Sequence, residues 1–316
     1  MNIVVLDGHA LNPGDLSWAP LESLGTVKVY PRSTPEEVVT RAKGAEIALT
    51  NKSLLLKAQL SELPNLKFIS VMATGYNIVD IELAKDKGIK VSNVVGYSTP
   101  SVAQHAMALM LELSNQVGLH QAEVAQGGWS RSIDWSYWKK PLVELSGKNL
   151  GIIGYGNIGQ ATANMARAFG MKILVYHPRM NDNAEEYELV SLDELFASSD
   201  FISLHVPLTD ETLAIVNRER LRQMKSTARL INTSRGPLVD EVDLRWALEQ
   251  GEIAGAGLDV LSNEPPPEDH PLIGAPNCLI TPHQAWASYE SRTRLMEETV
   301  KNVESFIKGQ QRNVVA

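Results

Sequence analysis

The sequence has 316 residues, of which 44% are hydrophobic and 21% charged, and its formal net charge is −8. This length predicts about two globular domains. The negative charge argues against nucleic acid or an anionic membrane as a partner, because it leaves little to neutralise phosphates. The single cysteine, Cys278, excludes an intrachain disulfide and a thiolate metal site, so we expect no metal. Without a signal peptide or an apolar stretch of membrane length, we expect a cytoplasmic protein.

Short apolar runs alternate with longer helical patterns in the first third of the chain. This alternation is typical of a parallel sheet with helices on both faces. A Ser-Thr-Pro-Glu-Glu run from Ser33 to Glu37 predicts a helix start. The predicted strands are Asn2–Asp7, Thr26–Tyr30, Ile47–Thr50, Lys67–Met72 and Lys90–Asn93.

A second series of the same kind follows a long apolar helix, predicted from Val102 to about Leu113. Between them lies Gln126–Lys140, which holds three of the six tryptophans. The last helix is predicted from Ser288 to Ile307. The second series predicts a six-stranded dinucleotide-binding sheet, with strands at Asn149–Tyr155, Lys172–Tyr176, Phe201–Val206, Ala228–Thr233, Ile253–Val260 and Cys278–Thr281.

The first strand of this second series runs into a G-x-G-x-x-G motif and then a predicted helix, Gln160–Phe169. Gly154 would allow a tight turn, Gly156 a close approach of the backbone to a pyrophosphate, and Gly159 close packing of helix on strand. A glycine-rich turn without a ligand is the alternative. The complete strand–loop–helix–strand context favours the phosphate loop.

The end of the next strand usually selects the coenzyme, since NAD sites place an acid there to bind the ribose hydroxyls. This sequence has His177 and Arg179 at that point, and no carboxylate. Arg179 would pair with a 2′-phosphate, so of NAD and NADP we favour the interpretation that NADP is accepted. In the alternative, His177 binds a ribose hydroxyl and Arg179 is a solvated surface residue.

Arg235 and His283 follow predicted strands, and Glu264 lies in the loop between two of these strands. Doubly wound sheets bind their ligands at such strand ends. An imidazole such as that of His283 exchanges protons near neutral pH, as hydride transfer at a hydroxyl carbon requires. A carboxylate, here Glu264, would fix the tautomer of the ring. Arg235 would hold a substrate carboxylate and polarise the carbonyl. Each residue alone would more often be structural, and only their joint placement favours catalysis.

These motifs together resemble the D-isomer specific 2-hydroxyacid dehydrogenase family. The resemblance rests on Gly154–Gly159, Asn232–Gly236, Asp259–Pro265 and Pro282–Trp286, and it covers essentially the whole chain. Ala73–Asn77 and Trp129–Ser132 are most similar to its glycerate dehydrogenase (hydroxypyruvate reductase) branch. The resemblance implies a reductase of hydroxypyruvate or glyoxylate, with Arg235, Glu264 and His283 in the roles given above.

The resemblance also implies further site residues. The segment Ala73, Thr74 and Gly75 would bind the substrate, with the backbone of Thr74 and Gly75 holding its carboxylate. Asp259 would bond the nicotinamide carboxamide. The other residues that would line the coenzyme are Thr99, Asn157, Ile158, Pro207, Thr212 and Thr233.

A discontinuous division of the chain is implied as well. Residues 1–98 with 286–316 would form a flavodoxin-like substrate-binding domain, and residues 99–285 a Rossmann-type dinucleotide-binding domain. The tryptophan-rich segment would belong to a homodimer arm, with Trp138 or Trp135 reaching the partner's active site. Aromatic packing within one subunit is the alternative.

Two other functions remain open from sequence. The same fold serves an NAD(H)-sensing co-repressor, which would carry added tails, whereas this chain ends shortly after its last predicted helix. In the second alternative the protein is still a dehydrogenase, but its substrate is phosphoglycerate or a bulkier 2-keto acid. Phosphoglycerate would need basic residues near Thr74, and the sequence there offers none.

Overall fold

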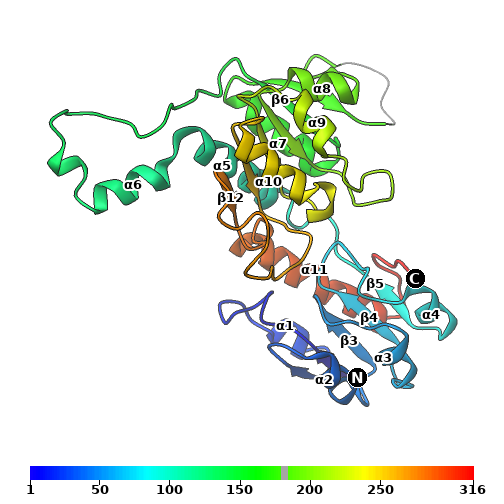
Figure 1. Cartoon of the computed structure of the whole chain (residues 1–316). Helices are drawn as coiled ribbons and strands as arrows, with labels where there is room; N and C mark the ends of the chain where they lie inside the picture. The colour runs from blue at the N-terminus through cyan, green and yellow to red at the C-terminus, as the bar shows by residue number, and fades with distance from the viewer. Residues whose placement is uncertain (179–183) are drawn as a thin grey trace. The chain divides into compact units, whose positions relative to one another are not determined.

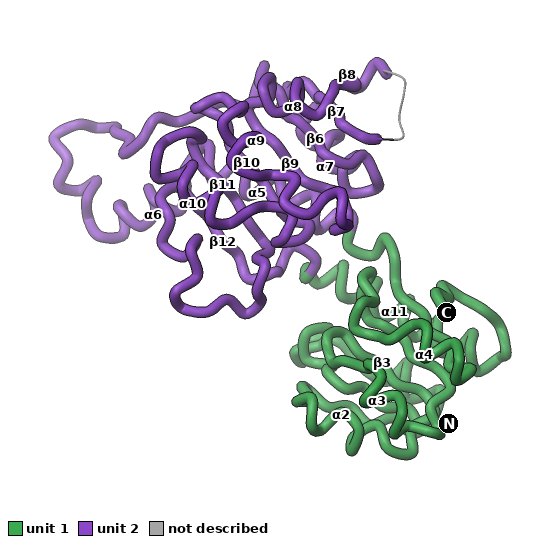
Figure 2. The backbone as a smooth tube through the Cα atoms, turned by 45° about the vertical axis from the view of Figure 1, so that its right-hand side comes forward, with its two compact units in different colours: residues 1–98, 287–316 green, residues 99–286 purple. Residues whose placement is uncertain are grey.

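The computed structural model describes residues 1–178 and 184–316, which fall into two compact units. The first unit comprises Met1–Ser98 and Ala287–Ala316, and the second Thr99–Trp286 (Figure 2). The predicted division placed the second crossing one residue earlier, since Trp286 belongs to the second unit. Among the described residues, no helix is both long and apolar enough to span a membrane.

The first unit is built on a parallel five-stranded sheet of order β2-β1-β3-β4-β5. Figure 1 labels three of its strands, β3, β4 and β5. The first turn of α2 (Pro35–Ala42) is stabilised by the Glu37 carboxylate, which accepts the Thr34 backbone N–H at 2.9 Å. The strands are β1 (Asn2–Val5), β2 (Thr26–Val29), β3 (Ile47–Thr50), β4 (Phe68–Val71) and β5 (Lys90–Ser92). The helices are α1 (Ala19–Glu22), α2 (Pro35–Ala42), α3 (Lys57–Ser61), α4 (Ile81–Asp86) and α11 (Tyr289–Ile307).

The last helix packs on the sheet of this unit. The ring of Phe306 on α11 stacks on that of Phe68 on β4, with centroids 4.5 Å apart. Asn302 donates to the carbonyl of Asn93 beyond β5 at 3.0 Å. The residues after α11 extend the sheet further, because Val314 forms an antiparallel bridge with Ser92.

The second unit is built on a parallel sheet which, over the described residues, has seven strands in the order β12-β11-β10-β9-β6-β7-β8. The sequence predicted six of them and missed the two-residue edge strand β8. The strands are β6 (Asn149–Ile153), β7 (Lys172–Tyr176), β8 (Glu188–Leu189), β9 (Phe201–Leu204), β10 (Arg229–Asn232), β11 (Gly255–Leu258) and β12 (Cys278–Ile280). The predicted α/β class with two doubly wound parallel sheets is confirmed.

Helices cover both faces of this second sheet. Neighbouring strand residues point to opposite faces, so that Ile152 packs in the core beneath α5 and α7 and Ile153 in the core beneath α8, α9 and α10. The helices are α5 (Thr99–Asn115), α6 (Val117–Ala125), α7 (Asn157–Ala168), α8 (Leu192–Ser198), α9 (Arg218–Gln223) and α10 (Glu241–Gln250). Short 3₁₀ turns occupy Trp129–Arg131 and Gly236–Leu238.

Candidate active site

The glycine loop after β6 has the geometry that a phosphate loop needs. Gly154 has φ +93°, and a Cβ there would lie 2.7 Å from the carbonyl oxygen of His205. A Cβ on Gly159 would lie 2.2 Å from the carbonyl oxygen of Gly154, so only glycine lets α7 pack this closely on the strand. A Cβ on Gly156 would meet nothing within 4 Å. The loop is thus tight at both ends and open in the middle, where the first turn of α7 begins at Asn157 and Ile158.

The other candidate coenzyme residues follow neighbouring strands at the same edge of the sheet. His177 follows β7, Pro207 and Thr212 follow β9, and Thr233 follows β10. Thr212 closes its loop by donating to the carbonyl of Pro207 at 2.7 Å. The Thr233 hydroxyl is buried and has no partner among the described residues, so it is available to a ligand. Arg179 lies outside the described residues.

Asp259, after β11, is the most heavily bonded of these residues. Its carboxylate is buried, and it accepts hydrogen bonds from the backbone N–H groups of Gln284 (2.9 Å) and Ala285 (2.8 Å). The hydroxyl of Thr281 also bonds to it, at 2.6 Å. Thr99, also a candidate coenzyme residue, is the first residue of α5.

His283 and Glu264 form a direct pair. Nδ1 of His283 lies 2.6 Å from Oε2 of Glu264, and both side chains are 30% exposed. The other Glu264 oxygen accepts the backbone N–H of Leu261 at 3.0 Å, which fixes the carboxylate within its own loop. With Nδ1 bonded to the carboxylate, Nε2 remains to exchange a proton with a ligand.

Arg235 is brought to this pair by contact between two loops. A Cβ on the following residue, Gly236, would lie 2.0 Å from the carbonyl carbon of Leu261, so the Arg235 turn packs directly on the loop that carries Glu264. The guanidinium is exposed and donates to its neighbour's carbonyl, that of Ser234. Among the described residues it has no carboxylate partner. An anionic substrate group can therefore bind there.

A second pair, missed by sequence reasoning, anchors the Glu264 loop from the other side. His270 is buried, and its Nε2 lies 3.0 Å from a carboxylate oxygen of Glu241 at the start of α10. Its Nδ1 accepts the Leu272 backbone N–H, so Nε2 carries the proton and donates to Glu241. The second Glu241 oxygen accepts the backbone N–H of Ser262 at 2.7 Å.

The candidate substrate segment lies in the first unit, directly after β4. Ala73 accepts from the backbone of Val94 at 3.0 Å, and the Thr74 hydroxyl donates to the carbonyl of Val94 at 3.0 Å. Within the described part of the chain, the backbone N–H groups of Thr74 and Gly75 donate to no protein acceptor. Two neighbouring amides of this kind suit a carboxylate.

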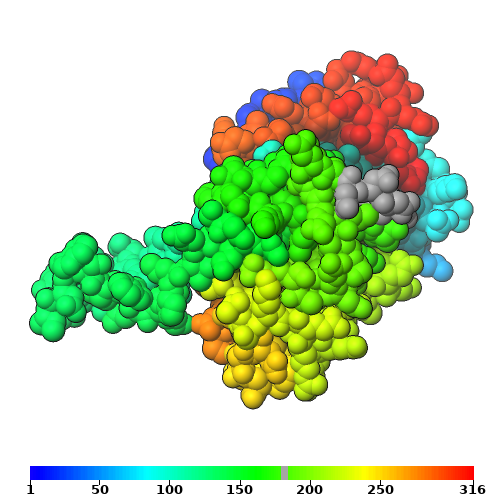
Figure 3. Space-filling view, turned by 90° about the horizontal axis from the view of Figure 1, so that it is seen from above, coloured from blue at the N-terminus to red at the C-terminus, as the bar shows by residue number. Residues whose placement is uncertain are grey.

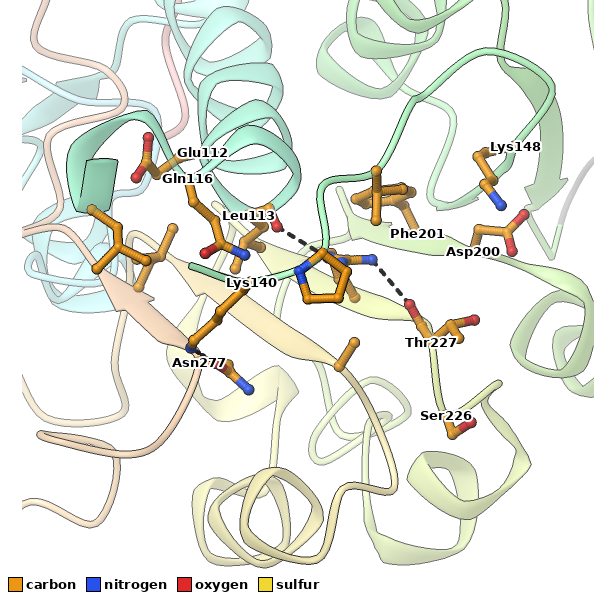
Figure 4. Close-up of a pocket in the computed structure, with 16 residues that line it drawn as sticks. Glu112, Leu113, Gln116, Lys140, Lys148, Asp200, Phe201, Ser226, Thr227 and Asn277 are labelled. Carbon is orange, nitrogen blue, oxygen red and sulfur yellow. Dashed lines mark hydrogen bonds between the residues drawn. The ribbon is translucent and has the colours of Figure 1, made fainter. Parts of the chain in front are cut away.

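A separate pocket of about 550 Å³ lies at the opposite, amino edge of the second sheet (Figure 4). Its lining includes Phe201 and Arg229, the first residues of β9 and β10, and Lys140, which donates to Asn277 at 2.6 Å. Parallel sheets bind their nucleotides at the carboxyl edge, so this pocket is not part of the coenzyme site.

The open parallel sheet, its glycine loop and the His283–Glu264 pair define a dinucleotide-dependent dehydrogenase. Residues 107–285 match the model of the D-isomer specific 2-hydroxyacid dehydrogenase NAD-binding domain. The chain therefore belongs to the D-isomer specific 2-hydroxyacid dehydrogenase family, as the motifs predicted. It is an NAD(P)-dependent enzyme for small 2-keto and 2-hydroxy acids.

Named relatives are similar over nearly all of the chain. The hydroxypyruvate reductase of Blautia hydrogenotrophica is 51% identical, covering 100% of this chain and 99% of that protein. The glycerate dehydrogenase of Methylorubrum extorquens is 43% identical, covering 89% of each. Among solved structures, an acyclic imino acid reductase in complex with NADPH and D-Arg has a TM-score of 0.86 at 34% identity, covering 100% of both chains.

Proposed function

We propose that this enzyme reduces hydroxypyruvate and glyoxylate to the corresponding D-2-hydroxy acids, and that His283 is its acid/base. The observation that carries the proposal is the 2.6 Å pair of His283 with Glu264, whose loop contacts the Arg235 turn at Leu261. The names of the relatives above support the choice of substrates.

Each residue of the site has one task in this reaction. A nicotinamide coenzyme, when bound, would supply the hydride for the carbonyl carbon. Nε2 of His283 gives its proton to the carbonyl oxygen, which becomes the hydroxyl, and Glu264 stabilises the imidazolium before that transfer. Arg235 binds the substrate carboxylate, and the backbone amides of Thr74 and Gly75 are a further candidate for binding a carboxylate. Residues 1–98 with 287–316 form the substrate-binding domain, and residues 99–286 carry the coenzyme site together with Arg235, Glu264 and His283.

The test is the initial rate of reduction of hydroxypyruvate, glyoxylate and pyruvate by the purified protein. We expect His283→Gln to lower kcat by about 100-fold or more, because a positioned general acid contributes about 10²–10⁴-fold. Glu264→Gln should lower kcat at least about tenfold, and Glu268→Gln, an exposed change in the same loop, should not. An active wild-type protein whose His283→Gln variant keeps full turnover would exclude this acid/base assignment.

We also propose that NADPH is accepted alongside NADH. The described residues after β7, His177 and Pro178, include no carboxylate that would repel a 2′-phosphate. Running each substrate with both coenzymes tests this, since a preference for NADH above about 100-fold would reject it.

We further propose a homodimer, held by an arm that comprises residues 117–140. The arm extends away from the rest of the second unit (Figures 1 and 3). It is stiffened by its own bonds, such as that from the Trp129 ring N–H to the carbonyl of Trp135 (3.0 Å). Ile133, Trp135 and Trp138 are nevertheless 100%, 89% and 65% exposed, so these three apolar side chains do not pack within their own subunit.

A second copy of the chain would cover these side chains, and Trp135 or Trp138 would reach the partner's active site. The molar mass in solution, from light scattering, tests the dimer. Trp135→Ala and Trp138→Ala test whether either tryptophan reaches the partner's active site. If both variants keep wild-type mass and turnover, neither tryptophan has this role.

A further inference from the structure

His105 is a histidine outside the proposed catalytic pair that nevertheless reaches it through a short chain of hydrogen bonds. It lies on α5, and its side chain is 19% exposed. Its Nε2 lies 2.9 Å from the hydroxyl of Thr281, immediately beyond β12, and 3.5 Å from a carboxylate oxygen of Asp259.

The direction of these bonds follows from the available protons. The Thr281 hydroxyl has one proton and lies 2.6 Å from the Asp259 carboxylate, which only accepts. Thr281 therefore donates to Asp259, and its free lone pair accepts the N–H of His105. This bond assigns the proton of His105 to Nε2.

Asp259 in turn holds the backbone around His283. Its carbonyl accepts the N–H of His283 at 2.9 Å, and its two carboxylate oxygens accept the N–H groups of Gln284 and Ala285. His283 has φ +50°, in the left-handed region that side-chain-bearing residues avoid. Such a backbone conformation is stable only where neighbouring groups hold it. Here the backbone N–H groups of three consecutive residues, 283 to 285, all donate to Asp259.

We propose that His105 is a positioning residue for His283, acting through Thr281 and Asp259. The Nε2–H of His105 donates to the Thr281 hydroxyl and fixes its orientation. The Thr281 hydroxyl then donates to the Asp259 carboxylate, which keeps Asp259 in position to accept the backbone N–H groups of residues 283–285. This inference rests on the proposed function insofar as His283 is taken as the acid/base.

The test compares variants that keep or remove the donor. In His105→Gln an amide N–H can replace Nε2–H, whereas His105→Leu has no donor. We expect His105→Leu to lower kcat by about tenfold to about 100-fold, because small displacements of a catalytic group have effects of this size. The dissociation constant for coenzyme should change less than about threefold. His105→Gln should recover most of kcat, and Gln104→Leu, on the same helix but exposed, should match the wild type.

A second set of variants tests the hydrogen-bond path through Thr281. These variants do not require His105→Leu to fold. Thr281→Ser keeps the hydroxyl and should stay close to wild type, whereas Thr281→Val should lose as much kcat as His105→Leu. Because both act through one hydrogen bond, the double variant His105→Leu with Thr281→Val should be no worse than Thr281→Val alone.

The outcomes separate this inference from the proposed function. If His283→Gln abolishes turnover while His105→Leu or Thr281→Val lowers only the melting temperature, the histidine merely anchors α5 and the positioning role is wrong. Equal losses in Thr281→Ser and Thr281→Val would also overturn it. If His283→Gln itself stays active, the acid/base assignment of His283 is wrong, and the positioning role of His105 falls with it.

Discussion

His205 directly follows β9 beside the glycine loop, and its imidazole shows what burial does to a titratable side chain. Nε2 lies 2.9 Å from the Ser203 hydroxyl, while Nδ1 is buried with no partner among the described residues. Burial lowers the pKa of His205 from 6.5 to about 4, because the charged ring would lose its hydration. The ring therefore stays neutral in the folded protein well into the acid range.

This depressed pKa predicts an acid-sensitive stability. Above pH 6.5 the ring is neutral in both the folded and the unfolded chain, so its full contribution is present. As the pH falls from 6.5 to about 4, the unfolded chain binds a proton that the folded chain does not, and up to about 3 kcal/mol is lost. Urea unfolding at a series of pH values checks this: His205→Gln should show a shallower dependence than the wild type, and His120→Gln should not.

At the scale of elements, the strands were predictable and the contacts between loops were not. Most of the predicted strands, such as Ile47–Thr50 and Phe201–Val206, contain a short run of buried apolar residues bounded by turn signals, and such runs favour strands. The edge strand Glu188–Leu189 has only two residues and carries no such pattern. The candidate residues Arg235, Glu264 and His283 could be named from the sequence because motifs carry them. His105 could not, since a histidine on an apolar helix gives no sign of its partner across the fold.

Gly236 is another residue whose role appears only in three dimensions. An added Cβ would lie 2.0 Å from the carbonyl carbon of Leu261, so Gly236→Ala must push the Arg235 turn away from the Glu264 loop. We expect kcat to fall by about 100-fold while the thermal unfolding temperature changes by only a few degrees. Gly251→Ala, at a helix end with open space around it, is the matched control for kcat. Wild-type kcat in Gly236→Ala would show that the two loops need not touch.

At the scale of the whole molecule, the C-terminal tail secures the edge of the first sheet. Val315 donates to the carbonyl of Val91 at 2.8 Å, and the Val91 N–H donates to the carbonyl of Ala316 at 3.0 Å. Asn313 contributes a further bond to the N–H of Asn93 at 3.2 Å. Without the tail these strand groups would face solvent as an open edge.

Removing residues 312–316 should therefore loosen β5 while leaving the second unit intact. Hydrogen exchange of the Val91 and Asn93 amides should accelerate by about tenfold or more, since each loses its acceptor. The amides of β6 and β9 in the second unit serve as the internal control. Unchanged protection at Val91 and Asn93 would contradict the bracing role of the tail.

The same arrangement has a consequence for how the chain is made. During translation the strands of the first sheet leave the ribosome early, but Phe306 and the tail that complete their packing emerge only after the entire second unit. The Phe68 face of β4 in the nascent first unit therefore stays uncovered while roughly 190 further residues are synthesised, which takes about 10–40 s at about 5–20 residues per second. The second unit, whose strands are contiguous in the chain, has all its sequence before the first unit does. The part encoded first is thus the part finished last, and cellular factors that shield apolar surfaces would act on it during that interval.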